Sequence, residues 1–165
     1  MKTVIIYATS RGTTEKAAQK LMNYLNHLQS KVTLINLRKE KIMNLADYDS
    51  VILGSSIHAG MVQGKMKKFI KAHQEELQSK KLGLYICCMY EGDKAKLQFE
   101  MAYPEQLRKN AVASGLFGGE FDFAKMNFLE KFIVKKVDGN AKDISTLSEE
   151  EIEKFAKTYN DCIGR

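Results

Sequence analysis

The stretch Tyr7-Ala8-Thr9-Ser10-Arg11-Gly12-Thr13-Thr14 directly follows the apolar run Val4-Ile5-Ile6 near the start of the chain. This order predicts a strand, then a turn rich in hydroxyl groups, then a helix. The hydroxyls, the backbone N–H groups and the positive end of the helix dipole favour an anion at one point. Gly12 permits a positive φ or the close approach of a ligand. The turn is therefore a candidate phosphate site.

The length of 165 residues predicts one domain with a sizeable core, and we expect a single domain over residues 1–165. No apolar run approaches the roughly 20 residues of a membrane span. The start of the chain lacks the layout of a signal peptide, which favours a cytoplasmic protein. Cys87, Cys88 and Cys162 are an odd set without metal-ligand spacing, so we expect no disulfide framework and no metal site.

The chain is basic, with a net charge of +6 and an isoelectric point near 9.1. Such a balance favours an anionic partner, such as a membrane surface or an acidic protein. The alternative is a lysine-rich surface that contacts only water. We expect no nucleic-acid binding, because the lysines are dispersed and no nucleic-acid-reading motif occurs.

Patterns of strand and helix alternate along the chain. Strand-like apolar runs occupy residues 3–8, 31–37, 50–56, 82–89 and 112–123. Apolar residues recur at helical spacing at 14–29, 62–78, 94–110 and 148–163. Pro104 predicts a kink or a new segment within the third of these helices. The alternation predicts an α/β fold, in which a five-stranded parallel sheet is covered by helices on both faces.

Three loops of this fold carry the residues that are suited to binding a ligand. Ligands of such folds bind beyond the carboxyl ends of the strands, near the point where the strand order reverses. The turn at residues 9–14, residues 54–61 after the third strand and residues 88–93 after the fourth meet this condition. Together they offer hydrogen-bond donors, an apolar ledge and the ring of Tyr90. This combination suits a flat, amphipathic ligand that carries a phosphate.

The first loop, Thr9-Ser10-Arg11-Gly12-Thr13-Thr14, resembles the phosphate loop of flavodoxins. Arg11 stands where flavodoxins usually have a hydroxyl residue, and Thr13 stands where they often have asparagine. Arg11 either supplies charge to a phosphate or points to solvent. The resemblance implies a three-layer, doubly wound flavodoxin-like fold with strand order 2-1-3-4-5, and it implies FMN as the cofactor.

Other phosphate loops fit this turn less well. A P-loop needs a lysine and a hydroxyl after the glycine, whereas Gly12 is followed by Thr13, Thr14 and Glu15. A dinucleotide loop needs three spaced glycines, and this turn has only Gly12. A phospho-acceptor receiver domain needs acidic residues near the end of the first strand, where residues 7–9 supply none.

The second loop, Gly54-Ser55-Ser56-Ile57-His58-Ala59-Gly60, resembles that of a flavodoxin-like subgroup, the quinone-dependent protoporphyrinogen oxidases. Residues 1–3, their spacing to Thr14 and the late segment 117–137 also resemble this subgroup. The resemblance implies an FMN oxidoreductase that passes electrons from a reduced substrate to a quinone. The alternatives are a flavodoxin proper, which carries electrons without its own substrate, and an interaction module without a cofactor.

The resemblance also implies which residues bind FMN, although it assigns no catalytic residue. The first loop holds the phosphate, residues 57–61 line the flavin, the backbone near Gly60 meets flavin N5, and Tyr90 stacks on the ring. The implied residues are Thr9, Ser10, Arg11, Gly12, Thr13, Thr14, Ser56, Ile57, His58, Ala59, Gly60, Met89, Tyr90, Glu91 and Gly92. The simpler alternatives are helix capping by Thr13 and Thr14, and surface positions for His58 and Tyr90.

A basic, aromatic insertion is expected at about residues 121–140. Its apolar residues recur at helical spacing and are accompanied by lysines: Met126, Leu129, Ile133 and Val137, with Lys125, Lys131, Lys135 and Lys136. This pattern predicts either an interfacial helix on an anionic membrane or ordinary core packing. We therefore expect a redox protein or a quinone as partner, and peripheral membrane contact by an otherwise cytoplasmic protein.

Overall fold

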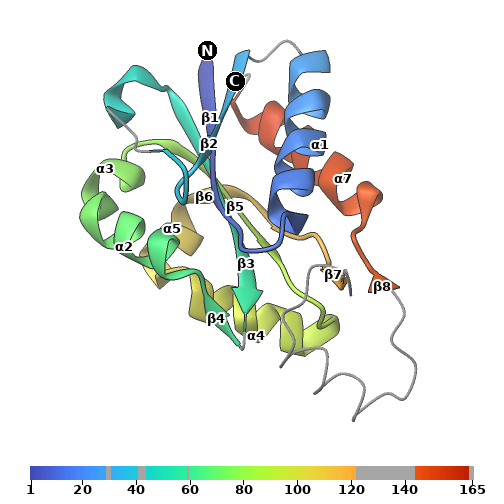
Figure 1. Cartoon of the computed structure of the whole chain (residues 1–165). Helices are drawn as coiled ribbons and strands as arrows, with labels where there is room; N and C mark the ends of the chain where they lie inside the picture. The colour runs from blue at the N-terminus through green and yellow to red at the C-terminus, as the bar shows by residue number, and fades with distance from the viewer. Residues whose placement is uncertain (29–30, 41–43, 59, 122–143, 164–165) are drawn as a thin grey trace, which may run out of the picture.

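The computed structural model describes the chain apart from residues 29–30, 41–43, 59, 122–143 and 164–165. Strands and helices alternate along the described residues (Figure 1). The strands are β1 (Lys2–Ala8), β2 (Lys31–Asn36), β3 (Ser50–His58), β4 (Met61–Val62), β5 (Lys81–Cys87), β6 (Ala111–Leu116), β7 (Glu120–Phe121) and β8 (Ile144–Ser145). The helices are α1 (Thr13–His27), the 3₁₀ helix η1 (Leu45–Asp47), α2 (Gly64–Ala72), α3 (Gln74–Gln78), α4 (Gly92–Ala102), α5 (Glu105–Asn110) and α7 (Glu149–Ile163).

The main sheet has the order β2-β1-β3-β5-β6, and these neighbours are parallel. The predicted order 2-1-3-4-5 is therefore confirmed, with β5 and β6 as the fourth and fifth strands. The short strand β4 was not predicted and pairs antiparallel with the end of β3. The strand order reverses at β1 and β3, where a doubly wound fold places its ligand.

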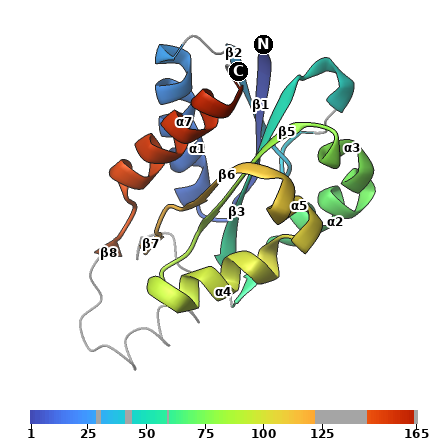
Figure 2. The ribbon, with the colours of Figure 1, turned by 180° about the vertical axis from the view of Figure 1, so that it is seen from behind.

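Helices cover both faces of the sheet, as the alternating pattern predicted. Figures 1 and 2 show α1 and α7 on one face, and α2, α3, α4 and α5 on the other. Alternate side chains of β1 supply the two cores, since Val4 and Ile6 pack toward α2–α5, whereas Ile5 and Tyr7 pack toward α1 and α7. The molecule therefore has the three layers of a doubly wound α/β fold.

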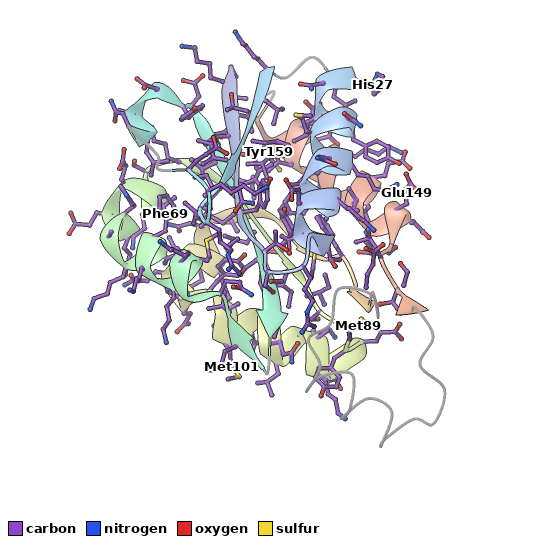
Figure 3. The ribbon with its side chains drawn as sticks, in the orientation of Figure 1. His27, Phe69, Met89, Met101, Glu149 and Tyr159 are labelled. Carbon is purple, nitrogen blue, oxygen red and sulfur yellow. The ribbon has the colours of Figure 1, made fainter. Side chains whose placement is uncertain are left out.

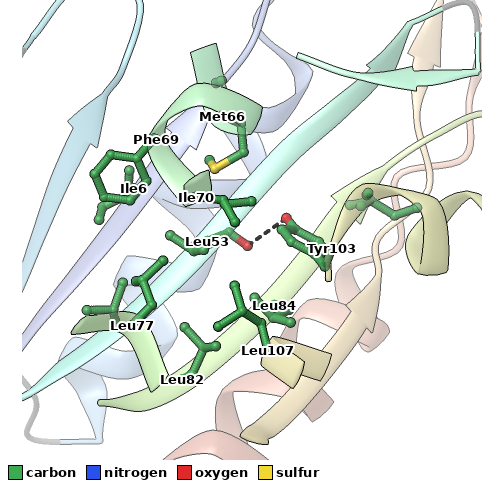
Figure 4. Packing of buried hydrophobic residues seen from close by; sticks show 14 of the residues in the cluster. Ile6, Leu53, Met66, Phe69, Ile70, Leu77, Leu82, Leu84, Tyr103 and Leu107 are labelled. Carbon is green, nitrogen blue, oxygen red and sulfur yellow. Dashed lines mark hydrogen bonds between the residues drawn. The ribbon is translucent and has the colours of Figure 1, made fainter. Parts of the chain in front are cut away.

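The core beneath α2–α5 contains the buried hydroxyl of Tyr103 (Figure 4). This hydroxyl lies 3.1 Å from the carbonyl oxygen of Leu53 and 2.7 Å from that of Tyr85, and it donates to them. A buried polar group needs such partners, because it has lost its hydrogen bonds to water. The contact links β3 to β5, the strands that lead into two of the three predicted ligand loops.

Two of the predicted helices are each divided into two helices in the structure. The prediction of one continuous helix at residues 62–78 was wrong. There α2 ends at Ala72 and α3 begins at Gln74, and the ring of His73 between them packs 4.6 Å from that of Phe69. In the range 94–110 a new segment begins after Pro104, as one of the two alternatives predicted. Proline disfavours a helical conformation in the preceding residue, and Tyr103 is extended with φ −125°.

The fifth strand region predicted at residues 112–123, with a break at Gly118-Gly119, is divided there, since β6 ends at Leu116 and β7 begins at Glu120. Gly118 has φ 76°, and a methyl group there would collide with the carbonyl of Thr146. The chain then leaves the main sheet, and β7 pairs antiparallel with β8. Residues 122–143, with most of the insertion predicted at 121–140, lie outside the described residues.

Candidate functional site

The three predicted ligand loops meet at one edge of the sheet. They follow β1, β3 and β5, which are parallel neighbours in that order. The carboxyl ends of parallel neighbours lie side by side, so the loops converge although up to about 80 residues separate them in the chain. Met89 of the third loop lies at this edge in Figure 3.

The first loop forms a tight turn into α1. Gly12 is the N-cap residue with φ 94°, and its N–H donates to Oγ1 of Thr9 at 3.0 Å. No side chain caps α1 in the described structure, so the alternative that Thr13 and Thr14 serve as helix caps is wrong. The first-turn N–H groups thus keep their capacity to bind an anion. Ser10 is exposed, and Arg11 and Thr13 are half-buried.

The hydroxyl of Thr14 is the most informative atom of this turn. Thr14 is fully buried, and its Oγ1 has no hydrogen-bond partner within the described residues. The nearby thiol of Cys87 is a weak hydrogen-bonding group and does not meet hydrogen-bond geometry with Thr14 Oγ1. Burial raises the pKa of this thiol to about 12, and the Thr14 hydroxyl opposes that rise. An unsatisfied buried hydroxyl costs about 1–3 kcal/mol. This group therefore fits a ligand that accepts a hydrogen bond, such as a phosphate.

The second loop is more ordered than predicted. β3 continues through His58, because Ile57 pairs with Val62 and His58 pairs with Met61 in a hairpin with β4. Much of the expected loop at residues 54–61 is therefore strand. Ser56 and Ile57 are half-buried, and Gly60 has φ 75°. Ala59 and the side chain of His58 lie outside the described part of the chain.

Gln63 joins the first two loops, although it was not among the residues predicted for the site. Its side-chain Nε2 donates to Oγ of Ser56 at 3.0 Å and to Oγ of Ser10 at 3.4 Å. Its backbone N–H also donates to Oγ of Ser55 at 3.4 Å. A glutamine just before a helix carries no distinctive sequence signal, so only the folded chain identifies this link.

The third loop begins at Cys88, as predicted, because β5 ends at Cys87, two residues before the predicted end of that strand. The Cys88 thiol donates to the carbonyl of Tyr90 at 3.5 Å, and Met89 is half-buried. Tyr90 is 53% exposed, and the ammonium of Lys94 lies 5.6 Å from its ring centroid. The aromatic ring is therefore available to a ligand at this edge. Glu91 and Gly92 are exposed at the start of α4.

Each loop contributes one glycine with a positive φ and open space beside it. The φ values are 94° for Gly12, 75° for Gly60 and 57° for Gly92. A methyl group placed on any of the three would meet no atom within 4 Å. Space for the close approach of a ligand therefore exists at all three loops. This space, together with the unpartnered Thr14 hydroxyl, fits a flat ligand that bears a phosphate.

The described residues show no candidate metal centre. No cluster of three or more histidine, cysteine, aspartate or glutamate side chains there is placed to hold a metal ion. Among the helices whose placement is described, none combines the length and the apolar character that crossing a bilayer requires.

The Tyr7 hydroxyl donates a hydrogen bond of 3.1 Å to the carboxylate of Glu15 below the turn. Burial is the main cause that raises the pKa of Tyr7 to about 12, and the contact with Glu15 is the second.

Known proteins match both the sequence and the fold. Residues 4–147 match the flavodoxin domain family. Protoporphyrinogen IX dehydrogenase [quinone] of Escherichia coli K12 is 29% identical over 85 residues, which are 52% of this chain and 47% of that protein. The match thus spans about half the length of this curated relative.

Two solved structures show the same fold at low sequence identity. Rubredoxin oxygen:oxidoreductase of Desulfovibrio gigas matches with a TM-score of 0.66 and 16% identity, over 99% of this chain and 36% of that one. Oxidised flavodoxin 1 of Bacillus cereus matches with a TM-score of 0.60 and 18% identity, over 100% and 99% of the two chains. The chain therefore belongs to the flavodoxin domain family, whose cofactor is FMN.

Proposed function

We propose that this protein is an FMN-dependent oxidoreductase that oxidises a protoporphyrinogen-like substrate and passes the electrons to a quinone. The observation that carries the proposal is the match to protoporphyrinogen IX dehydrogenase [quinone] over 85 residues. The open edge of the sheet supports it, because Tyr90 and Met61 beside the loops are more than half exposed. A flavin held there would be within reach of a large, flat substrate.

The first loop is proposed to hold the phosphate of FMN. The Thr14 hydroxyl gains an acceptor, and the N–H groups of the uncapped first turn of α1 donate to the same phosphate. Thr9 keeps the turn in shape through its bond to Gly12. The flanking side chains of Ser10, Arg11 and Thr13 complete the proposed phosphate site.

The second and third loops are proposed to line the flavin ring. The ring would lie between residues 56–60, at the hairpin of β3 and β4, and residues 89–92, before α4. When bound, FMN accepts a hydride or electron pair and can release the electrons singly. The chain's own part is to orient the ring, and the backbone at Gly60 and the ring of Tyr90 are proposed for that role.

A turnover assay separates this function from its alternative. Purified holoprotein is mixed with protoporphyrinogen IX under anaerobic conditions, with and without a menaquinone analogue, and porphyrin fluorescence is followed. We expect the parent to form porphyrin only when the quinone is present. We expect Thr14→Val to lose this activity at limiting FMN. Absence of porphyrin formation, with a flavin that other proteins can still reduce and oxidise, would reject the oxidase.

The second candidate is an electron carrier without its own substrate. It is favoured by the fold match to Bacillus cereus flavodoxin 1, which extends over essentially the whole of both chains. In this case the partner is a redox protein. Both candidates place the protein in the cytoplasm, and the oxidase adds peripheral contact with the membrane that holds the quinone.

Gln63→Ala is expected to weaken FMN binding by about tenfold, since it removes two hydrogen bonds between the phosphate loop and the β3 edge. The affinity is measured by quenching of FMN fluorescence on titration with apoprotein. Gln74→Ala is the matched control, because its side chain bonds to Gln106 at 2.9 Å on the surface between α3 and α5. Equal affinities of the two variants would show that Gln63 does not position the cofactor loops.

A further inference from the structure

Helix α2 carries an uncompensated positive face. Lys65, Lys67, Lys68 and Lys71 are all exposed, and the helix contains no acidic residue. No ion pair reaches any of the four within the described residues. Its buried side, made of Met66, Phe69 and Ile70, packs on the sheet, so the lysines occupy the side that faces solvent.

Most lysines on the other described helices have carboxylate partners. Each of the following pairs lies within ion-pair distance: Lys16–Glu120 at 2.8 Å, Lys20–Glu149 at 2.9 Å, Lys96–Asp93 at 3.6 Å, Lys109–Glu105 at 2.7 Å, Lys154–Glu151 at 3.8 Å and Lys157–Glu153 at 2.8 Å. The exception among these helices is Lys94 of α4, which lies over the ring of Tyr90. Helix α2 differs from the others because all four of its lysines lack such a partner within the described residues.

The placement of these lysines is unfavourable for an isolated helix. Lys65 and Lys68, Lys68 and Lys71, and Lys67 and Lys71 are three or four residues apart, where like charges repel. The first turn of α2 also carries lysines at the positive end of the helix dipole. Both effects would be relieved by a negatively charged surface outside the protein.

Exposed apolar side chains lie on elements that cover the same side of the sheet as α2. Met61, just before α2, is 68% exposed, and Leu97 and Met101 of the neighbouring helix α4 are 57% and 67% exposed. β4, which carries Met61, packs beside α4, and both helices cover the same side of the sheet (Figures 1 and 3). The four lysines, with Met61, Leu97 and Met101, are called the α2–α4 face below.

We propose that the α2–α4 face docks this protein on an anionic lipid membrane. Lysines attracted to acidic headgroups, together with large apolar side chains that enter the headgroup region, are the two components of peripheral membrane binding. A lipid surface satisfies both kinds of side chain, because acidic headgroups attract the lysines and the headgroup region receives Met61, Leu97 and Met101. An acidic protein is the other occupant of such a face, and the vesicle assay below distinguishes the two.

The docked orientation would place the cofactor site at the membrane. Helix α2 begins directly after Gln63, whose side chain bonds to Ser10 and Ser56 of the first two ligand loops. The α2–α4 face therefore ends at the candidate FMN site. Transfer of electrons to a membrane quinone from this position rests on the proposed function, whereas the docking itself does not.

Binding of the FMN-loaded full chain to vesicles tests the docking without substrate or quinone. Vesicles of phosphatidylcholine alone are compared with vesicles of equal parts phosphatidylcholine and phosphatidylglycerol in a sedimentation assay at low salt. Each neutralised lysine should lower the partition coefficient about fivefold, so the triple variant Lys65→Gln, Lys68→Gln, Lys71→Gln should lose about a hundredfold. The matched control, Lys20→Gln, Lys154→Gln, Lys157→Gln, removes the same charge from α1 and α7 and should lose far less.

A second variant tests the apolar component. Leu97→Asn with Met101→Asn keeps every lysine and should still weaken binding to the acidic vesicles, including at raised salt where electrostatic attraction is screened. The proposal is overturned if the parent does not bind acidic vesicles, which would leave the lysines to an acidic protein. It is also overturned if both triple variants lose equally, since binding would then follow net charge alone. Oxidase turnover with a water-soluble quinone analogue is scored separately, so failure of one proposal is distinct from failure of the other.

Discussion

Replacing Thr14 with valine is expected to weaken FMN binding by about 10- to 100-fold, while the apoprotein stays at least as stable as the parent. The parent buries the Thr14 hydroxyl without a hydrogen-bond partner, and valine replaces that hydroxyl with a methyl group of similar shape. A hydrogen bond to a charged phosphate contributes about 1.5–3 kcal/mol, and this contribution is lost in the variant. The opposite signs of the two effects separate a ligand-binding hydroxyl from a structural one.

Thr3→Val is the matched control for this prediction. The Thr3 hydroxyl is equally buried but lies 2.8 Å from the hydroxyl of Ser50, so valine there removes a buried hydrogen bond. This variant should lose about 1–3 kcal/mol of unfolding free energy and keep the parent's FMN affinity. Fluorescence titration gives the affinities, and urea unfolding of the apoproteins gives the stabilities. A destabilised Thr14→Val apoprotein with unchanged FMN affinity would assign its hydroxyl to the fold.

Replacing Gly54 with alanine is expected to destabilise the protein by about 3 kcal/mol, and the larger valine should prevent folding. Gly54 lies in β3 between β1 and β5, and a Cβ there would overlap the ring of Tyr85 on β5. That ring is fully buried, stacks on Phe117 at 4.5 Å between centroids and meets Phe155 edge-on at 6.3 Å. Because these neighbours hold the ring in place, the added methyl group has no space.

Gly64→Ala is the control for Gly54→Ala. Gly64 opens α2 on the surface, and a methyl group there would meet no atom within 4 Å. The control should be neutral, or more stable by about 0.4–1 kcal/mol, because alanine restricts the unfolded chain. Urea unfolding measures both variants. Similar stability of the two would mean that Tyr85 moves aside and that its packing does not constrain β3.

The sequence pattern predicted the strands and the three loops that follow them, and the resemblance to flavodoxins supplied the order of the sheet. Apolar periodicity is local, so the runs at β1, β3 and β5 and the glycine turn at Gly12 are visible without the fold. A parallel doubly wound sheet then brings the ends of these strands together by its topology alone. For this reason the three loops could be expected to lie together although they are far apart in the chain, and the structure places them at one edge of the sheet.

Contacts that depend on the folded geometry could not be predicted. The bond between Gln63 and Ser10 joins residues 53 positions apart, and no spacing rule indicates it. The break at His73 depends on packing against Phe69, and the continuation of β3 through His58 depends on pairing with β4. The four lysines of α2 can be read from the sequence. Only the structure shows that they lack the carboxylate partners that most lysines of the other described helices have.

The most direct test of the central claim compares the affinities of one apoprotein for FMN and for riboflavin, which lacks the phosphate. The account places the phosphate at the Thr14 hydroxyl and the uncapped first turn of α1. It therefore predicts that FMN binds at least about a hundredfold more tightly than riboflavin, through several charge-assisted hydrogen bonds. It also predicts that Thr14→Val narrows this difference by weakening FMN alone. Equal affinities for the two flavins, or an equal loss of both in Thr14→Val, would contradict the account.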